Sequence, residues 1–170
     1  MTLESALLNL FSSIPSWLAV ILIAAIPVGE LRLSIPIAML KPPYGFGMDP
    51  ITAFSLSVIG NMLPVIPLLL YLEPVSNYLR RWKTWDRYFT WLFTRTHRKH
   101  SAEFEKYGSI GLAIFVGIPL PATGAWTGCA AAFVFGFNFK NALAAIFAGV
   151  LIAGTIMTLL TTGINIFNNI

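Results

Sequence analysis

Long apolar stretches on either side of one basic stretch dominate the pattern of this chain. Residues 50–72 contain no charged side chain, and neither do residues 107–139 or 141–170. A helix of about 20 apolar residues is long enough to cross the hydrocarbon core of a bilayer. The pattern therefore predicts an all-α integral membrane protein with two continuous transmembrane helices, over residues 51–72 and 142–167.

Two further apolar stretches, 17–40 and 110–137, are interrupted by helix-breaking residues. The breaks are at Pro27 and Pro36 in the first stretch and at Pro119, Pro121 and Gly124 in the second. Proline removes a helical hydrogen bond and clashes with the preceding turn, so these residues divide each stretch into shorter arms. Neither arm of either stretch is long enough to span the membrane alone. Each stretch is either one kinked crossing or a re-entrant hairpin. Irregular backbone at membrane depth must then be buried in protein or line a water-filled cavity.

The order of these features is the same in both halves, which predicts an internal repeat. Ile26-Pro27 corresponds to Ile118-Pro119, and Tyr44-Gly45-Phe46 corresponds to Phe135-Gly136-Phe137. We expect a single membrane domain over 1–170, with a first repeat over 1–72 and a second over 108–170. If the hairpins are re-entrant, the repeat is inverted, as is common in transporters. If they are kinked crossings, there are four spans and both termini share the side of the linker.

Residues 73–107 join the two repeats and carry eight of the eleven Lys and Arg residues. Short basic loops stay in the cytoplasm, so the linker is predicted to be cytoplasmic. Helical spacing places five apolar residues on one face, which predicts an amphipathic helix at the membrane interface or a solvated lid beneath the protein. These five residues are Tyr78, Trp82, Trp85, Phe89 and Leu92.

Composition agrees with this pattern and excludes several classes of function. Hydrophobic residues make up 56% of the chain and charged residues only 11%, against about 25% charged residues in a soluble domain. The lone Cys129 excludes an intramolecular disulfide. The net charge of +4 comes mostly from the linker, so it does not indicate nucleic-acid binding. Phosphate-loop, hydrolase and zinc patterns are absent from the sequence, so we expect no enzyme, metal or cofactor.

The sequence AAIPVGELRLSIP at residues 24–36 contains the candidate site. Glu30 and Arg32 are the only ionisable residues within the apolar segments. Ionisable residues at membrane depth are candidates for function because they are costly to bury. Arg32 can bind a phosphate or carboxylate as a planar fork, and Glu30 can hold or release a proton. The alternatives are a structural ion pair, or side chains that reach back to the interface.

Polar residues near the breaks complete the predicted transport site. Ser34 precedes Ile35-Pro36 and is expected to cap a helix that begins there. Asn61 lies within the 51–72 span and needs a partner, most simply a hydrogen bond to another helix. Thr123 is expected to cap the helix after the second break. Together with Trp126 and Thr127, it could also line the same cavity as the charged pair.

IPVGELRLSIP at residues 26–36 and GIPLPATGAWTG at residues 117–128 resemble the small multidrug export proteins, a family grouped with the DedA/VTT superfamily. The resemblance covers nearly the whole chain and implies two opposed re-entrant hairpins, each followed by a transmembrane helix. It also implies transport, because members of the superfamily are linked to flipping of lipids, including polyprenyl phosphates, often driven by the proton-motive force. In DedA-type sequences one hairpin carries acids near a pair of prolines. Here Pro119 and Pro121 match that pair, but Thr123 stands near the place where an acid is expected. Glu30 is therefore expected to take the acidic role.

These observations lead to three hypotheses about function. The first is a flippase for an anionic lipid, such as an undecaprenyl-type phosphate, in the cell membrane. Its transport could be coupled to protons or to another ion. The second is an exporter of small cationic drugs with Glu30 as counter-charge. The third is a membrane-organising protein that acts through the linker 73–107 without transport. A homodimer is expected to help bury the hairpins.

Overall fold

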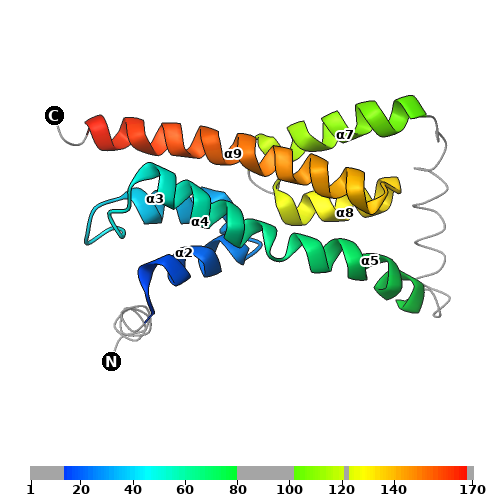
Figure 1. Cartoon of the computed structure of the whole chain (residues 1–170), viewed down its shortest axis with the longest axis horizontal. Coiled ribbons are helices and arrows are strands. Elements are labelled where there is room, and N and C mark those ends of the chain that lie inside the picture. The colour runs from blue at the N-terminus through cyan, green and yellow to red at the C-terminus, as the bar shows by residue number, and fades with distance from the viewer. Residues whose placement is uncertain (1–13, 80–101, 121–122, 168–170) are drawn as a thin grey trace. The chain divides into compact units, whose positions relative to one another are not determined.

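The computed structural model describes residues 14–79, 102–120 and 123–167, and these residues form helices joined by short connections (Figure 1). The first half contains α2 (Ser16–Ala25), α3 (Glu30–Met39), α4 (Pro50–Met62) and α5 (Val65–Leu79). The second half contains α7 (Ala102–Gly117), α8 (Ala125–Phe135) and α9 (Phe139–Phe167). The prediction of an all-α chain is confirmed for the described residues.

Within the described residues, two helices are long and apolar enough to cross a membrane, and they agree with the two predicted spans. They cover Pro50–Leu72 and Phe139–Ile166. The first is interrupted at Leu63-Pro64, between α4 and α5, and Pro64 accounts for the break. α5 continues to Leu79 and α7 begins at Ala102, so both helices extend into the predicted linker. Most of the aromatic face predicted for the linker, from Trp82 onward, lies outside the described residues.

The two interrupted stretches form helical hairpins. α2 packs against α3, and α7 packs against α8, so the arms of each stretch lie side by side rather than end to end. The 10 residues of α2 and the 10 residues of α3 each give a helix about 15 Å long, half the thickness of a bilayer core. Pro27 lies in the connection of the first hairpin and Pro119 in that of the second, as predicted. Pro121 lies outside the described residues.

The chain divides into two compact units, and each unit contains one hairpin. Among the described residues, unit 1 comprises 14–61 and 154–167, and unit 2 comprises 62–79, 102–120 and 123–153. Unit 1 therefore holds α2, α3, most of α4 and the end of α9. Unit 2 holds α5, α7, α8 and the start of α9. Each long apolar stretch contributes to both units, so the units do not coincide with the predicted repeats, which remain a prediction.

Equivalent contacts recur in the two units. In unit 1, a side chain at Gly60 would meet the backbone of Ile21 and the side chain of Ala24 on α2. In unit 2, a side chain at Gly149 would meet Ala113 and Val116 on α7. Both α2 positions precede their α7 counterparts by 92 residues, as Pro27 precedes Pro119. In each half, a glycine on the long apolar helix therefore allows the first arm of the hairpin to pack closely against that helix, at equivalent positions.

The long helices also begin in the same way. Before α4, the carboxylate of Asp49 accepts hydrogen bonds from the backbone N–H groups of Ile51 and Thr52, at 3.1 and 3.0 Å. Before α9, the side-chain oxygen of Asn138 accepts from the N–H of Asn141 at 2.9 Å. Both residues are N-caps, which satisfy the free N–H groups of a helix start. The side-chain and backbone hydrogen bonds from Thr52 lower the pKa of Asp49. Asp49 precedes Asn138 by 89 residues, the separation of Gly60 from Gly149.

Candidate functional site

The first hairpin turns over residues 26–29, and α3 begins directly after the turn. The carbonyl oxygen of Ile26 accepts from the N–H groups of Gly29 and Glu30, at 3.2 and 3.1 Å. A side chain at Gly29 would lie 2.8 Å from the carbonyl oxygen of Ile23, so only glycine fits this close approach. This tight tip fixes the backbone from which Glu30 and Arg32 project.

Glu30 is both buried and conformationally strained. Its side chain is 6% exposed, and its backbone has φ of 45°, in the left-handed region that residues other than glycine seldom adopt. Such a conformation costs of the order of 1–3 kcal/mol and is found preferentially at functional sites. The residue before α3 is Gly29, which has no side chain to cap the helix. The acidic group nearest to the start of α3 is that of Glu30. The strain and the burial together mark Glu30 as a functional candidate.

Arg32 lies in the first turn of α3 and is half-buried. Residues two apart on a helix point to different faces. Since α3 is helical from Glu30 onward, helix spacing favours different faces for the acid and the base. The structure therefore places the predicted pair together at one end of α3.

The prediction that Ser34 caps a helix is wrong. α3 starts four residues earlier, so Ser34 lies in its interior and Pro36 is inside the helix rather than at a break. A membrane helix tolerates an internal proline because neighbouring groups can satisfy the freed backbone. The second break of the first stretch instead follows Leu40, where the N–H groups of Phe46 and Met48 donate to the carbonyl oxygens of Ile37 and Ala38.

Three fully buried side chains of unit 1 carry polar atoms that have no hydrogen-bond partner. They are the hydroxyls of Ser34 and Ser57 and both terminal atoms of Asn61. Ser34 and Ser57 are 0% exposed, and Asn61 is 1% exposed. An unsatisfied buried polar group costs about 1–3 kcal/mol. The expected hydrogen bond from Asn61 to another helix is therefore absent, and Ser57 is a candidate that the sequence prediction missed.

The end of α9 adds a polar edge to unit 1, and its groups do have partners. Thr158 donates to the carbonyl oxygen of Gly154, and the buried Thr161 donates to that of Met157, both at 2.8 Å. Asn165 donates to the carbonyl oxygen of Met39 at the end of α3, at 3.4 Å. The threonine hydroxyls therefore bond within α9, and Asn165 bonds to α3. The polar groups of Ser34, Ser57 and Asn61, in contrast, have no partner.

The predicted site residues of the second half all lie in unit 2. The prediction that Thr123 caps α8 is wrong, because the N-cap is Gly124, with φ of 137°. The Thr123 hydroxyl instead donates back to the carbonyl oxygens of Ile118 and Leu120, at 2.8 Å each. Thr127 is exposed on α8 and donates to the carbonyl oxygen of Gly124. Trp126 borders an apolar groove with Pro64 and residues of α5. That these residues share a cavity with Glu30 remains a prediction.

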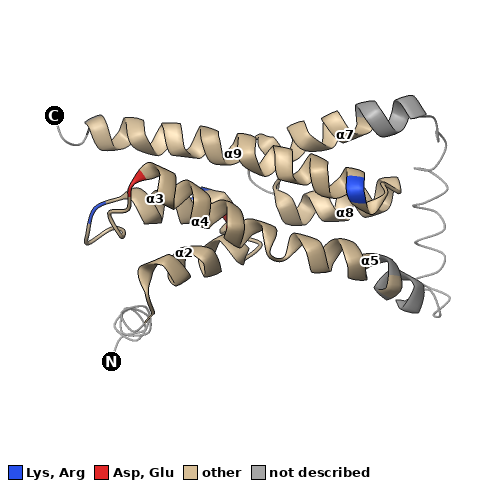
Figure 2. Cartoon of the chain, viewed as in Figure 1, with Lys and Arg blue, Asp and Glu red and all other residues tan. Residues whose placement is uncertain are grey.

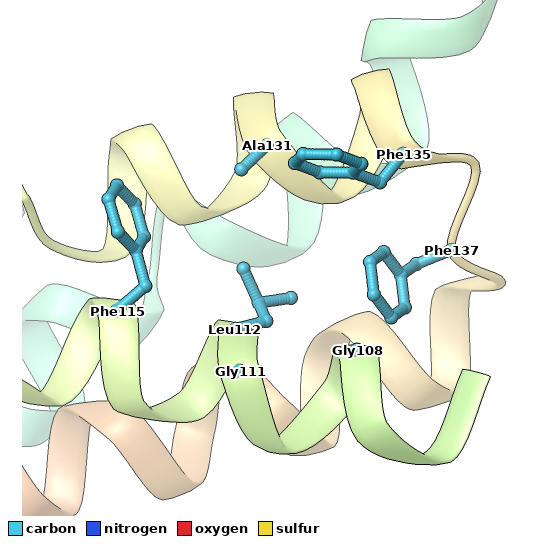
Figure 3. A pocket seen from close by; sticks show the side chains of 7 residues that line it. All are labelled: Gly108, Gly111, Leu112, Phe115, Ala131, Phe135 and Phe137. Atoms are coloured by element: carbon cyan, nitrogen blue, oxygen red, sulfur yellow. The ribbon is translucent and has the colours of Figure 1, made fainter. Parts of the chain in front are cut away.

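Unit 2 also contains an apolar cavity of about 460 Å³ between the arms of its hairpin (Figure 3). α7 and α8 supply its walls, and the rings of Phe115 and Phe137 lie at its two ends. On the α7 side, Gly111 leaves open space, and Gly108 leaves room for the ring of Phe137. The complete lining is Gly108, Gly111, Leu112, Phe115, Ala131, Phe135 and Phe137. The cavity can take a hydrocarbon group but offers no polar side chain to orient one.

Charged residues are sparse among the described helices (Figure 2). Within 14–72, 108–120 and 123–167 the sequence has Glu30, Arg32, Lys41, Asp49 and Lys140. No three His, Cys, Asp or Glu side chains gather in the described part of the chain. The site therefore consists of Glu30 and Arg32 at the start of α3 and of the buried polar groups of α3 and α4.

Comparison with known proteins identifies a family but no individual relative. Residues 30–156 match the family described as "Putative small multi-drug export protein". Neither the curated proteins nor the solved structures give a match. The matched region includes Glu30, Arg32, the whole of the first long apolar helix and most of the second, which agrees with a membrane location. The wider placement in the DedA/VTT superfamily remains a prediction. Because the match covers most of the chain, this protein belongs to the small multidrug export family and is a membrane protein.

Proposed function

We propose that this chain transports an anionic lipid, in the first instance an isoprenoid phosphate, across the cell membrane. The observation that carries the proposal is the tip of the first hairpin. There a buried, strained Glu30 and a half-buried Arg32 occur in helices that are otherwise apolar. Ionisable side chains at membrane depth are characteristic of substrate and ion pathways.

The proposed topology is an inverted repeat of two re-entrant hairpins. Each arm of the first hairpin is about half as long as the bilayer core is thick, so it would reach the midplane and return. The equivalent contacts of Gly60 and Gly149 support the repeat, as do the equivalent caps at Asp49 and Asn138. In inverted repeats of this kind, substrate sites lie near the midplane and the two halves alternate access to them.

The two charged residues take different roles in this mechanism. The planar guanidinium of Arg32 binds the phosphate head group as a fork. The start of α3 adds the positive end of the helix dipole. Glu30 binds the coupling cation, in the simplest case a proton. Helix spacing favours different faces for residues two apart, so head group and cation can be bound together.

The apolar cavity of unit 2 supports an amphipathic substrate. Its wholly apolar lining suits a segment of an isoprenoid or acyl chain. Hydrocarbon in a preformed apolar pocket gains contacts with the aromatic walls and needs no polar partner. A lipid with a charged head requires an apolar and a charged surface, and the chain has the first in unit 2 and the second in unit 1.

Reconstituted vesicles provide the test. Transbilayer movement of a fluorescent isoprenoid phosphate is measured with purified wild type, Arg32→Ala, Arg32→Lys and Glu30→Gln. Lys140→Gln removes an exposed positive charge elsewhere and is the control. We expect Arg32→Ala and Glu30→Gln to lose at least about tenfold in rate, since one charge-assisted contact contributes about 1.5–3 kcal/mol. Wild-type rates in both variants would exclude this mechanism.

The export of small cationic drugs is the second candidate, and the family description favours it. Glu30 would then be the counter-charge for the drug, and the apolar grooves would hold its body. Arg32 close by in the sequence would repel such a substrate. A resistance profile that is lost in Glu30→Gln and kept or strengthened in Arg32→Ala would favour the drug over the lipid.

A further inference from the structure

The unpartnered polar groups of unit 1 have no role in the function proposed above. The hydroxyls of Ser34 and Ser57 and the amide of Asn61 are completely enclosed, yet none of their polar atoms has a hydrogen-bond partner. Buried polar side chains normally do have partners, so exceptions point to a missing water, ion or ligand. Three such side chains occur in one small helical unit.

The second half of the chain provides an internal control for these positions. At the separation that relates Gly60 to Gly149, Ser57 corresponds to Ile146 and Asn61 corresponds to Val150. Ile146 and Val150 are both 0% exposed. The same positions are therefore filled by apolar side chains in unit 2, where they need no partner. Helix packing alone does not require the serine and the asparagine of unit 1, which points to a ligand for them.

Helix spacing groups the polar side chains on one face of α3 and one face of α4, and contacts give these two helices common neighbours. Glu30 and Ser34 lie one turn apart on α3, and Ser57 and Asn61 lie one turn apart on α4, so each pair shares a helix face. α2 packs on α3, and it also approaches α4 at Gly60, next to Asn61.

α9 approaches the same two helices from another side. A side chain at Gly154 would lie 2.8 Å from the ring of Phe54 on α4 and 3.7 Å from Leu31 on α3. Phe54 precedes the buried Ser57 by one turn, and Leu31 precedes the buried Ser34 by one turn. α3 and α4 thus have α2 and α9 as common neighbours, and their buried polar faces lie within that four-helix unit.

We propose that Glu30, Ser34, Ser57 and Asn61 bind one dehydrated sodium ion. The set offers two hydroxyl oxygens, one amide oxygen and one carboxylate, and hard cations prefer oxygen ligands. A carboxylate has about four acceptor sites, so Glu30 can bind the ion alongside its other partners.

Charge selects a monovalent cation. The single buried carboxylate neutralises one positive charge, whereas a divalent ion would leave a net charge inside the unit, which is costly. An anion would meet the carboxylate directly. Sodium would thus be the coupling cation of Glu30. That coupling role rests on the function proposed above, whereas the binding itself does not.

Two measurements on the purified full-length protein in detergent micelles test this site. The first is equilibrium binding of radioactive sodium, for which we expect one ion per chain. The second is the thermal unfolding midpoint in sodium, potassium and choline chloride at constant ionic strength. We expect a saturable rise with sodium that choline does not give. A midpoint that is equal in sodium and choline, with no bound sodium, would overturn the proposal and leave buried water as the partner.

Variants taken from the other half of the chain locate the ion. Ser57→Ile and Asn61→Val introduce the residues that unit 2 carries at the equivalent positions, so folding should be kept. We expect each to weaken sodium binding by at least about tenfold, as loss of supporting groups does in other ion sites. Thr161→Val is the matched control, because this buried hydroxyl already has a partner. Sodium binding that survives in both Ser57→Ile and Asn61→Val would also overturn the proposal. Sodium binding without lipid movement would refute only the proposed transport function.

Discussion

Replacing either Gly60 or Gly149 with alanine should destabilise the protein by a similar amount. A Cβ at Gly60 would lie 2.8 Å from that of Ala24 and still closer to the backbone of Ile21. A Cβ at Gly149 would lie 2.6 Å from that of Val116 and 2.7 Å from the carbonyl oxygen of Ala113. At Gly60 the obstacle is mostly the backbone of Ile21, and at Gly149 it is the side chain of Val116 and a backbone carbonyl oxygen. Backbone and Cβ atoms cannot rotate out of the way, so the first hairpin arm must move away from the long helix.

The expected size follows from two opposing terms. Overpacking a core costs about 1–3 kcal/mol, and rigid obstacles favour the upper end of that range. Alanine in a helix gains about 1 kcal/mol over glycine. The net loss is therefore about 2 kcal/mol for each variant. Gly163→Ala is the control, since a Cβ there meets nothing within 4 Å, and it should gain up to about 1 kcal/mol.

Reversible unfolding by SDS in mixed micelles, followed by tryptophan fluorescence, gives these free energies. We expect the free energies of unfolding of Gly60→Ala and Gly149→Ala to be lower than that of the wild type by a similar amount. The free energy of unfolding of Gly163→Ala should not be lower. If Gly60→Ala and Gly149→Ala match Gly163→Ala, the close helix approach is refuted. If only one of the two destabilises, the equivalence of the two halves is refuted.

Three further predictions concern single positions. Hydrogen bonds lower the pKa of Asp49 below its ordinary value of 3.8, so its stabilising effect is complete above that pH and is lost as the pH falls through the lowered value. The stability difference between wild type and Asp49→Asn, measured by SDS unfolding, should therefore change only at acid pH. Asn61→Val should raise stability in sodium-free buffer by about 1–3 kcal/mol, because it removes unsatisfied buried groups, and a loss of stability would contradict their lack of partners. Gly111→Leu should fill the apolar cavity and slow lipid movement without affecting sodium binding, and unchanged lipid movement would exclude the cavity from the pathway.

The sequence predicted the long helices and the hairpin breaks because apolar length and proline act locally. Residues 51–72 and 142–167 are too long and too apolar for another role, and Pro27 and Pro119 do lie in the hairpin connections. The interrupted stretches could not be assigned as hairpins or kinked crossings, since that choice depends on whether α2 packs against α3.

The details of the site depended on tertiary contacts that local rules do not contain. Ser34 before Ile35-Pro36 has the pattern of a helix start, yet packing in unit 1 carries α3 back to Glu30 and retains the proline inside it. Thr123 has the chemistry of a cap, yet its hydroxyl bonds backward into the break. Ser57 could have been predicted from the sequence. It lies one helical turn from Asn61, and its counterpart in the repeat is the apolar Ile146.

The central claim is that two re-entrant hairpins form an inverted repeat, and cysteine accessibility tests it most directly. In a background with the buried Cys129 replaced by alanine, single cysteines are placed at Tyr44 and at Lys140, which are both exposed. Intact cells are treated with a membrane-impermeant thiol reagent before and after lysis. Re-entrant hairpins place residues 44 and 140 on opposite sides of the membrane, so only one of the two positions should react before lysis. Kinked crossings place them on the same side, so equal labelling of both before lysis, or of neither, would contradict the account.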